Sequence, residues 1–70
     1  MKFEEWLVKQ RKKKGNSQEE LARILGVQER TISRWENGHS FPSSDLLVKI
    51  LRYFNLSKTA YEEFIRVEFD

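Results

Sequence analysis

Apolar residues recur along the chain at spacings of three and four, which is typical of helices that bury one face. No stretch alternates apolar and polar residues for long enough to indicate a β-strand. The pattern divides the chain into five helical segments with short gaps between them. These expected helices cover about 3–13, 18–25, 28–37, 44–54 and 58–67. The chain is therefore predicted to be all-α, with no internal repeat and no linker.

Residues that stop and start helices stand in the gaps between these segments. Glycine and asparagine favour the backbone that ends a helix, and serine caps the first turn of the next one. The stop residues are Gly15, Asn16, Gly26, Asn37, Gly38 and Asn55, and the start residues are Ser17, Ser43 and Ser57. Ser17 and Glu20 have the spacing of a capping box, in which each side chain accepts the other residue's backbone N–H.

Each expected helix carries its apolar residues on one face. In segment 28–37, Ile32 and Trp35 point toward the core with Val27, and Trp35 is assigned to the core. The polar residues of this segment that point outward are Glu29, Arg30, Ser33, Arg34 and Asn37. The remaining helix faces are made by Phe3, Trp6, Leu7, Gln10 and Arg11, by Leu21, Ala22, Ile24 and Leu25, by Leu47, Ile50, Leu51 and Phe54, and by Tyr61, Phe64 and Ile65. The pattern leaves open whether Trp6 is buried or half exposed.

The most informative span covers about 17–38, where two short helices flank the tight turn Leu25-Gly26-Val27. Glycine at the centre lets the backbone reverse without a Cβ clash. The outward residues of the second helix can form hydrogen bonds with the edges of bases. Arginine reads guanine, glutamine reads adenine and glutamate accepts from cytosine. This is the helix-turn-helix layout, in which the second helix enters the major groove of DNA.

A specific set of residues around this span carries a family resemblance. It consists of Arg11, Gly15, Ser17-Gln18-Glu19-Glu20-Leu21-Ala22, Leu25-Gly26-Val27, Thr31-Ile32-Ser33-Arg34-Trp35-Glu36-Asn37-Gly38, Pro42-Ser43 and Leu47. With these residues the chain resembles the phage Cro/cI-repressor-like helix-turn-helix family over about 3–66. The resemblance implies one compact five-helix, lambda-repressor-like domain over residues 1–70. It also implies a transcriptional regulator that binds double-stranded DNA sequence-specifically, commonly as a dimer on a palindromic operator.

The resemblance assigns roles to individual residues. The base-reading positions on the recognition helix, about 28–37, are Gln28, Glu29, Arg30, Ser33 and Arg34. The phosphate-contacting positions are Ser17 and Gln18 at the start of the preceding helix, and Asn37, His39 and Ser40 after the recognition helix. Arg11 and Glu36 match a pair that the family often buries as an ion pair between its first and third helices.

Two positions and one loop depart from the family pattern. Gln28 stands where relatives often have serine or threonine, and glutamine is a poor helix cap. Glu29 places a carboxylate on the groove-facing surface, where it either reads cytosine or repels phosphate. The loop after the recognition helix reads His-Ser-Phe-Pro, whereas many relatives have lysine or arginine there. We therefore expect fewer phosphate contacts on that side.

Composition narrows the range of functions. The chain has 70 residues, no cysteine and one histidine, which excludes disulfides, thiolate zinc sites and metal sites with several histidines. No cofactor is expected. The sequence shows neither an apolar run long enough to span a membrane nor a signal peptide, so the expected compartment is the cytoplasm. The net charge is +2, as the sum of +4 over residues 1–34 and −2 over residues 35–70. A polyanion should therefore bind at the N-terminal half.

Competing interpretations remain open at this point. The same fold could serve as a protein-interaction module, or as a regulatory domain of a larger protein, without sequence-specific DNA binding. An enzyme is not expected, because no nucleophile–base pair or metal set can be assembled from these residues. Lys12, Lys13 and Lys14 either form a basic patch or offset the negative end of their own helix.

The C-terminal end raises a separate hypothesis. Val67 and Phe69 follow the expected fifth helix with nothing obvious to cover them. In the family the last helix commonly helps to form the dimer, so these side chains could contribute to a homodimer. The alternative is a frayed terminus without such a role.

Overall fold

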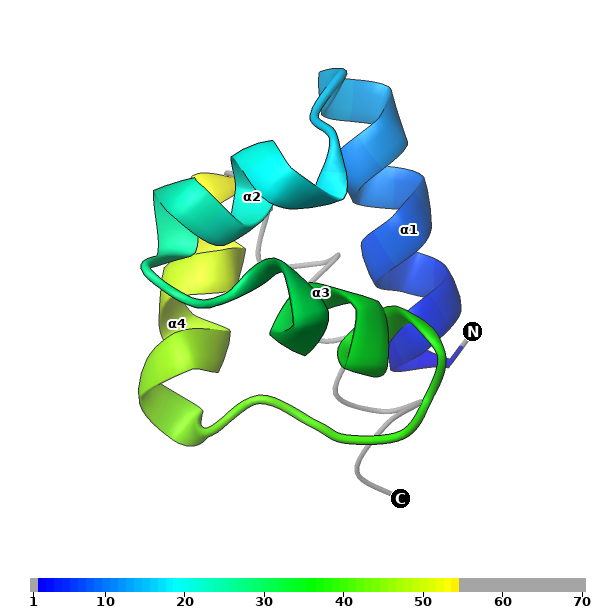
Figure 1. The fold of residues 1–70 in the computed structure, drawn as a ribbon, viewed down its shortest axis with the longest axis vertical. Helices are drawn as coiled ribbons and strands as arrows, with labels where there is room; N and C mark the ends of the chain where they lie inside the picture. Colours follow the sequence, from blue (N-terminus) through cyan, green and yellow to red (C-terminus); the bar gives the residue numbers. More distant parts are fainter. Residues whose placement is uncertain (1, 55–70) are drawn as a thin grey trace.

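The described part of the chain, residues 2–54 of a computed structural model, contains four helices and no strand (Figure 1). They are α1 (Phe3–Lys14), α2 (Gln18–Leu25), α3 (Glu29–Glu36) and α4 (Ser44–Tyr53). The first four predicted helices are confirmed, and their ends differ from the prediction by at most one residue. The predicted fifth helix, about 58–67, lies outside the described residues, as do Val67 and Phe69.

The core is built from the apolar faces that the spacing predicted. Its buried residues are Phe3, Trp6, Leu7, Leu21, Ala22, Leu25, Ile32, Trp35 and Ile50. Trp6 is buried, with its ring stacked on Phe3 and edge-on to Phe54, which settles the question that the pattern left open. Ile24 is exposed and does not belong to this core, although it lies on the same short helix as Leu25.

The helices pack so that α3 is held from two sides. α3 contacts both α2 and α1, and α4 packs against α2. In Figure 1, α1 and α4 lie on opposite sides of the α2–α3 pair. Helices of eight residues such as α2 and α3 are too short to be stable alone, so this packing maintains them. No helix among residues 2–54 has the length and apolar character needed to cross a membrane.

The helix starts follow the predicted caps. The Ser17 side chain accepts the Glu20 N–H, and the Glu20 side chain accepts the Ser17 N–H, at 3.0 and 2.8 Å. The second of these bonds lowers the pKa of Glu20 below the ordinary 4.5, because it favours the ionised carboxylate. Ser43 caps α4 with a single bond, its hydroxyl oxygen accepting the Leu46 N–H, whereas Gln28 makes no capping bond to α3. The capping box and the poor cap at Gln28 are both confirmed.

The end of α2 is closed by a glycine and contacted by a lysine. Gly26 closes α2 at φ 75°, and the next residue, Val27, donates its N–H to the Ala22 carbonyl at 2.9 Å. This is the pattern of a left-handed helix cap. The Lys49 ammonium donates to the Leu25 carbonyl at 3.2 Å and so places a positive charge at the same negative helix end. The turn between α2 and α3 is thus fixed by local backbone geometry and by a contact from α4.

We expect Gly26→Ala to destabilise the fold by about 1–2 kcal/mol, because a Cβ disfavours the left-handed backbone. Chemical denaturation measures the free energy of unfolding of both proteins. Gly26→Asn is the matched control, since asparagine tolerates this backbone better and should lose less. Equal stability of the alanine variant and the native chain would show that the turn does not require this conformation.

Candidate functional site

One face of α3 is exposed while the opposite face fills the core. Ile32 and Trp35 are buried. The four exposed residues on and just before the helix are Gln28, Glu29, Arg30 and Arg34. They carry two guanidinium groups, one carboxylate and one carboxamide, so this face offers both hydrogen-bond donors and acceptors. We call these four residues the α3 face.

The charges of the α3 face suit the helix that carries them. Glu29 lies in the first turn, where the helix dipole is positive, and Arg34 lies in the last turn, where it is negative. The one side-chain bond on this face is long, from Arg30 Nη2 to Gln28 Oε1 at 3.5 Å. Within residues 2–54, no side-chain hydrogen bond or ion pair ties Glu29 or Arg34 to the rest of the fold. The face therefore has polar groups available to a ligand.

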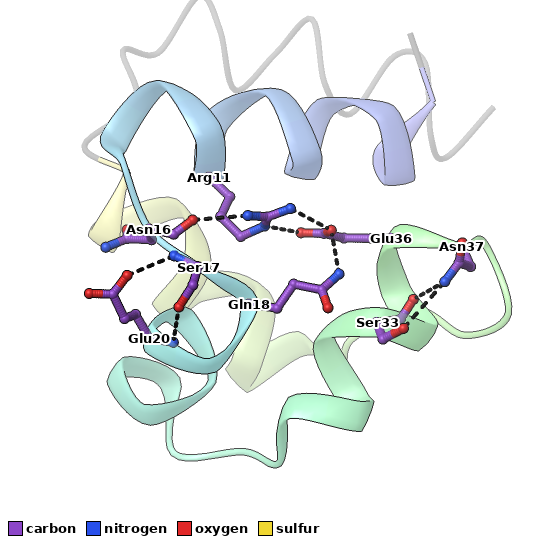
Figure 2. Close-up of polar contacts among 8 residues, drawn as sticks. All are labelled: Arg11, Asn16, Ser17, Gln18, Glu20, Ser33, Glu36 and Asn37. Atoms are coloured by element: carbon purple, nitrogen blue, oxygen red, sulfur yellow. Dashed lines mark hydrogen bonds and ion pairs between the residues drawn. The ribbon is translucent and has the colours of Figure 1, made fainter.

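Ser33 and Asn37 form a pair at the end of α3 (Figure 2). The Asn37 amide nitrogen donates to the Ser33 carbonyl at 2.8 Å and to Ser33 Oγ at 3.3 Å. Ser33 is half-buried, unlike the outward position that the spacing predicted. Because its hydroxyl oxygen accepts from Asn37, the hydroxyl hydrogen stays available as a donor. Asn37, which the sequence predicted as a residue that ends a helix, is thus the C-cap of α3, and its side chain bonds back to the last turn.

The loop after α3 continues from this cap. His39 donates its N–H to the Arg34 carbonyl at 2.9 Å, across Gly38 at φ 75°. His39 and Ser40 are exposed. This backbone bond fixes how the chain leaves α3, so the exposed loop begins from a defined position beside the α3 face.

The start of α2 turns one of its polar side chains inward. Ser17 is exposed, but Gln18 is half-buried, and its amide nitrogen donates to Glu36 Oε1 at 2.9 Å (Figure 2). One of the two amide hydrogens of Gln18 is therefore used within the fold, and the second remains. The bond connects the first residue of α2 with the last residue of α3.

The acceptor of that bond belongs to an ion pair between α1 and α3. Arg11 Nε lies 2.6 Å from Glu36 Oε2, and Arg11 Nη2 lies 3.1 Å from Glu36 Oε1. Their side chains are 12% and 5% exposed. The hydrogen bond to Glu36 raises the pKa of Arg11, against the opposing effect of burial. The two residues that the family resemblance pairs are therefore in direct, two-point contact.

A second polar cluster was not predicted from the sequence. The Lys14 ammonium donates to the Tyr53 carbonyl at 2.7 Å and lies 4.0 Å from the centre of the Tyr53 ring. The Tyr53 hydroxyl donates to Asn16 Oδ1 at 2.5 Å. Lys14 therefore caps the end of α4, which neither interpretation of the lysine run anticipated. Tyr53 is separated from its partners by 37 and 39 residues, so no local pattern pointed to these contacts.

The described residues offer no group of three side chains of the types that hold a metal ion. The polar groups at hand are those of the α3 face, the Ser33–Asn37 pair, the start of α2 and the loop at 39–40. They include both hydrogen-bond donors and acceptors.

The chain is similar to a known protein family. A family model described as helix-turn-helix, of the Cro/C1 type, matches residues 7–60, which is most of the chain. Comparison with curated proteins and with solved structures gave no match.

We expect Glu36→Ala to lower the free energy of unfolding by about 3–5 kcal/mol, because it leaves the Arg11 guanidinium largely buried without its counter-charge. Chemical denaturation followed by circular dichroism measures the loss. Arg23→Ala is the control. It breaks the exposed pair with Glu19, in which the two charged atoms are 4.0 Å apart, and should cost less than about 1 kcal/mol. Equal losses in the two variants would contradict a special role for the buried pair.

Proposed function

The chain belongs to the Cro/C1-type helix-turn-helix family, a DNA-binding family typical of transcription regulators, and from this premise we propose that it is a sequence-specific, double-stranded-DNA-binding transcriptional regulator. The observation that carries the proposal is the α3 face. It presents two arginines and a glutamate on α3 and a glutamine just before it, while the opposite side of the helix is buried in the core. An α-helix held this way fits the width of the major groove.

The α3 face reads the bases in this proposal. Arg30 and Arg34 each donate two hydrogen bonds to a guanine, and Gln28 pairs with an adenine. Glu29 accepts from a cytosine amino group, so a site that lacks cytosine there would meet an unpaired carboxylate. The Ser33 hydroxyl adds a donor toward a base acceptor, since its oxygen already accepts from Asn37.

Phosphate contacts in this proposal come from the start of α2, which is bonded to the last residue of α3, and from the loop that follows α3. Ser17 and Gln18 lie at the start of α2, where backbone N–H groups and the helix dipole favour an anion. Gln18 keeps one amide hydrogen for a phosphate while the other binds Glu36. Asn37, His39 and Ser40 contact the DNA backbone from the loop that follows α3. Such contacts fix the register of the protein on DNA but carry no sequence information.

The assembly on DNA is part of the same proposal. Two copies bind a palindromic operator, because a symmetric dimer meets two equal half-sites. The C-terminal segment is the proposed dimer contact, through Val67 and Phe69. A protein-interaction module on the same fold is the competing function, and the binding experiment distinguishes the two.

The test is selection from a pool of randomised DNA duplexes, followed by sequencing, at two salt concentrations. We expect a palindrome to be enriched, with affinity that falls steeply as salt rises, because phosphate contacts release counterions. Weak retention without any enriched sequence would contradict the proposal. It would indicate instead that the fold serves as a scaffold for a protein partner.

We expect Arg34→Ala to weaken binding to the selected duplex by about 1–3 kcal/mol and to relax the preference at one base pair. Affinities for the selected duplex and for single-base variants of it measure both effects. Arg23→Ala removes the same charge from the exposed surface of α2 and should weaken all duplexes equally and slightly. Uniform weakening by Arg34→Ala as well would mean that Arg34 contacts phosphate and does not read a base.

A further inference from the structure

The loop between α1 and α2 is held from two sides. Arg11 Nη1 donates to the Asn16 backbone carbonyl at 2.9 Å, and the Tyr53 hydroxyl donates to the Asn16 side-chain oxygen at 2.5 Å. Arg11 belongs to α1, whereas Tyr53 is the last residue of α4. Asn16 and Tyr53 are both half-buried. The loop that leads into α2 is therefore anchored to two separate helices by its backbone and by its side chain.

Tyr53 is itself held in place by α1. The Lys14 ammonium binds the Tyr53 carbonyl and lies over the Tyr53 ring, which combines a helix-end contact with a cation–π contact. With Asn16, these residues link the end of α1, the loop after it and the end of α4. The ring of Tyr53 also packs beside Phe54 at the margin of the core. The hydroxyl thus reaches the loop from a ring that Lys14 and Phe54 both contact.

The position of this link matters because Asn16 leads directly into α2. The next residue, Ser17, caps α2, and Gln18 is its first residue. These two residues are the ones proposed to bind phosphate. A binding group that is already ordered loses less entropy when the ligand arrives. Without the hydroxyl, Asn16 keeps two backbone bonds to Arg11, in which its carbonyl accepts from Nη1 at 2.9 Å and its N–H donates to the Arg11 carbonyl at 3.1 Å. It loses its side-chain bond to α4, so the approach of Ser17 and Gln18 is less defined.

We propose that Tyr53 is a positioning residue for DNA binding, whose hydroxyl, through Asn16, holds the start of α2 in the geometry that a DNA phosphate requires. The inference rests on the proposed function, since it concerns the phosphate contact of that same surface. Tyr53 itself does not touch DNA. Its effect extends to every duplex alike, because a phosphate contact does not distinguish sequences.

The test is Tyr53→Phe, which removes the hydroxyl and keeps the ring that Lys14 covers. We expect the affinity for the selected duplex to fall about two- to tenfold, as for the loss of one pre-ordered side chain. The affinity for a scrambled duplex should fall by the same factor, so the ratio between the two stays unchanged. Both are measured where circular dichroism shows that native and variant chains are fully folded.

Two further variants separate positioning from general stability. Ser43→Ala removes one hydroxyl hydrogen bond from the other end of α4. It should lower the melting temperature and leave the affinity for DNA unchanged. Asn16→Ala keeps the backbone carbonyl that Arg11 binds but removes the partner of Tyr53. The double variant Asn16→Ala with Tyr53→Phe should bind no more weakly than the weaker of the two single variants, because both act through one bond.

The outcomes distinguish this inference from the proposed function. Sequence-selective binding by the native chain, together with these losses in the variants, supports both. If the native chain binds DNA and Tyr53→Phe binds equally well, only the positioning role is overturned. Losses that add in the double variant, or an equal loss in Ser43→Ala, overturn it too. If the native chain binds no duplex, the proposed function fails and the positioning role falls with it.

Discussion

The carboxylate of Glu36 is the point at which the first three helices meet. It stands at the end of α3 and accepts from Arg11 of α1 and from Gln18 of α2. A buried ion pair contributes little net stability after desolvation, but its geometry is demanding, so it restricts how the helices can cross. Arg11 extends the same network to the loop before α2 through the Asn16 carbonyl. Together with the Gly26 turn and the shared core, these few bonds restrict the relative orientation of α2 and α3, and with it every proposed contact to DNA.

The four described helices could be predicted to within a residue because their limits are set locally. The bonds between Ser17 and Glu20 and the left-handed backbone at Gly26 depend on residues only a few positions apart. The contact of Lys14 with Tyr53 depends instead on how α1 and α4 pack, and a long lysine side chain has several partners within reach. Periodicity also could not show that Gln18 turns inward, because a residue in the first helical turn lies at the boundary between faces.

The candidate site could be predicted in part. Burial of Ile32 and Trp35 follows from their spacing, and exposure of the opposite face follows from the same periodicity. Ser33 is the exception, because it is half-buried, and its carbonyl and hydroxyl oxygens accept from the Asn37 amide four residues further on. The Arg11–Glu36 contact was expected from a family resemblance, since residues 25 positions apart share no local pattern. The roles toward bases and phosphates stay predictions, as they concern a partner outside the chain.

The division of α3 into a buried and an exposed face has an evolutionary consequence. Residues Gln28, Glu29, Arg30 and Arg34 contribute little to the core, so substitutions there leave the packing of Ile32 and Trp35 intact. Surface substitutions of this kind usually change stability by less than about 0.5 kcal/mol. Under the proposed function, a lineage with this scaffold can therefore change the DNA sequence that it binds through variants that still fold. Selection on folding and selection on the proposed recognition therefore act on different positions within α3 at these four residues, whereas Ser17 and Gln18 would be under both.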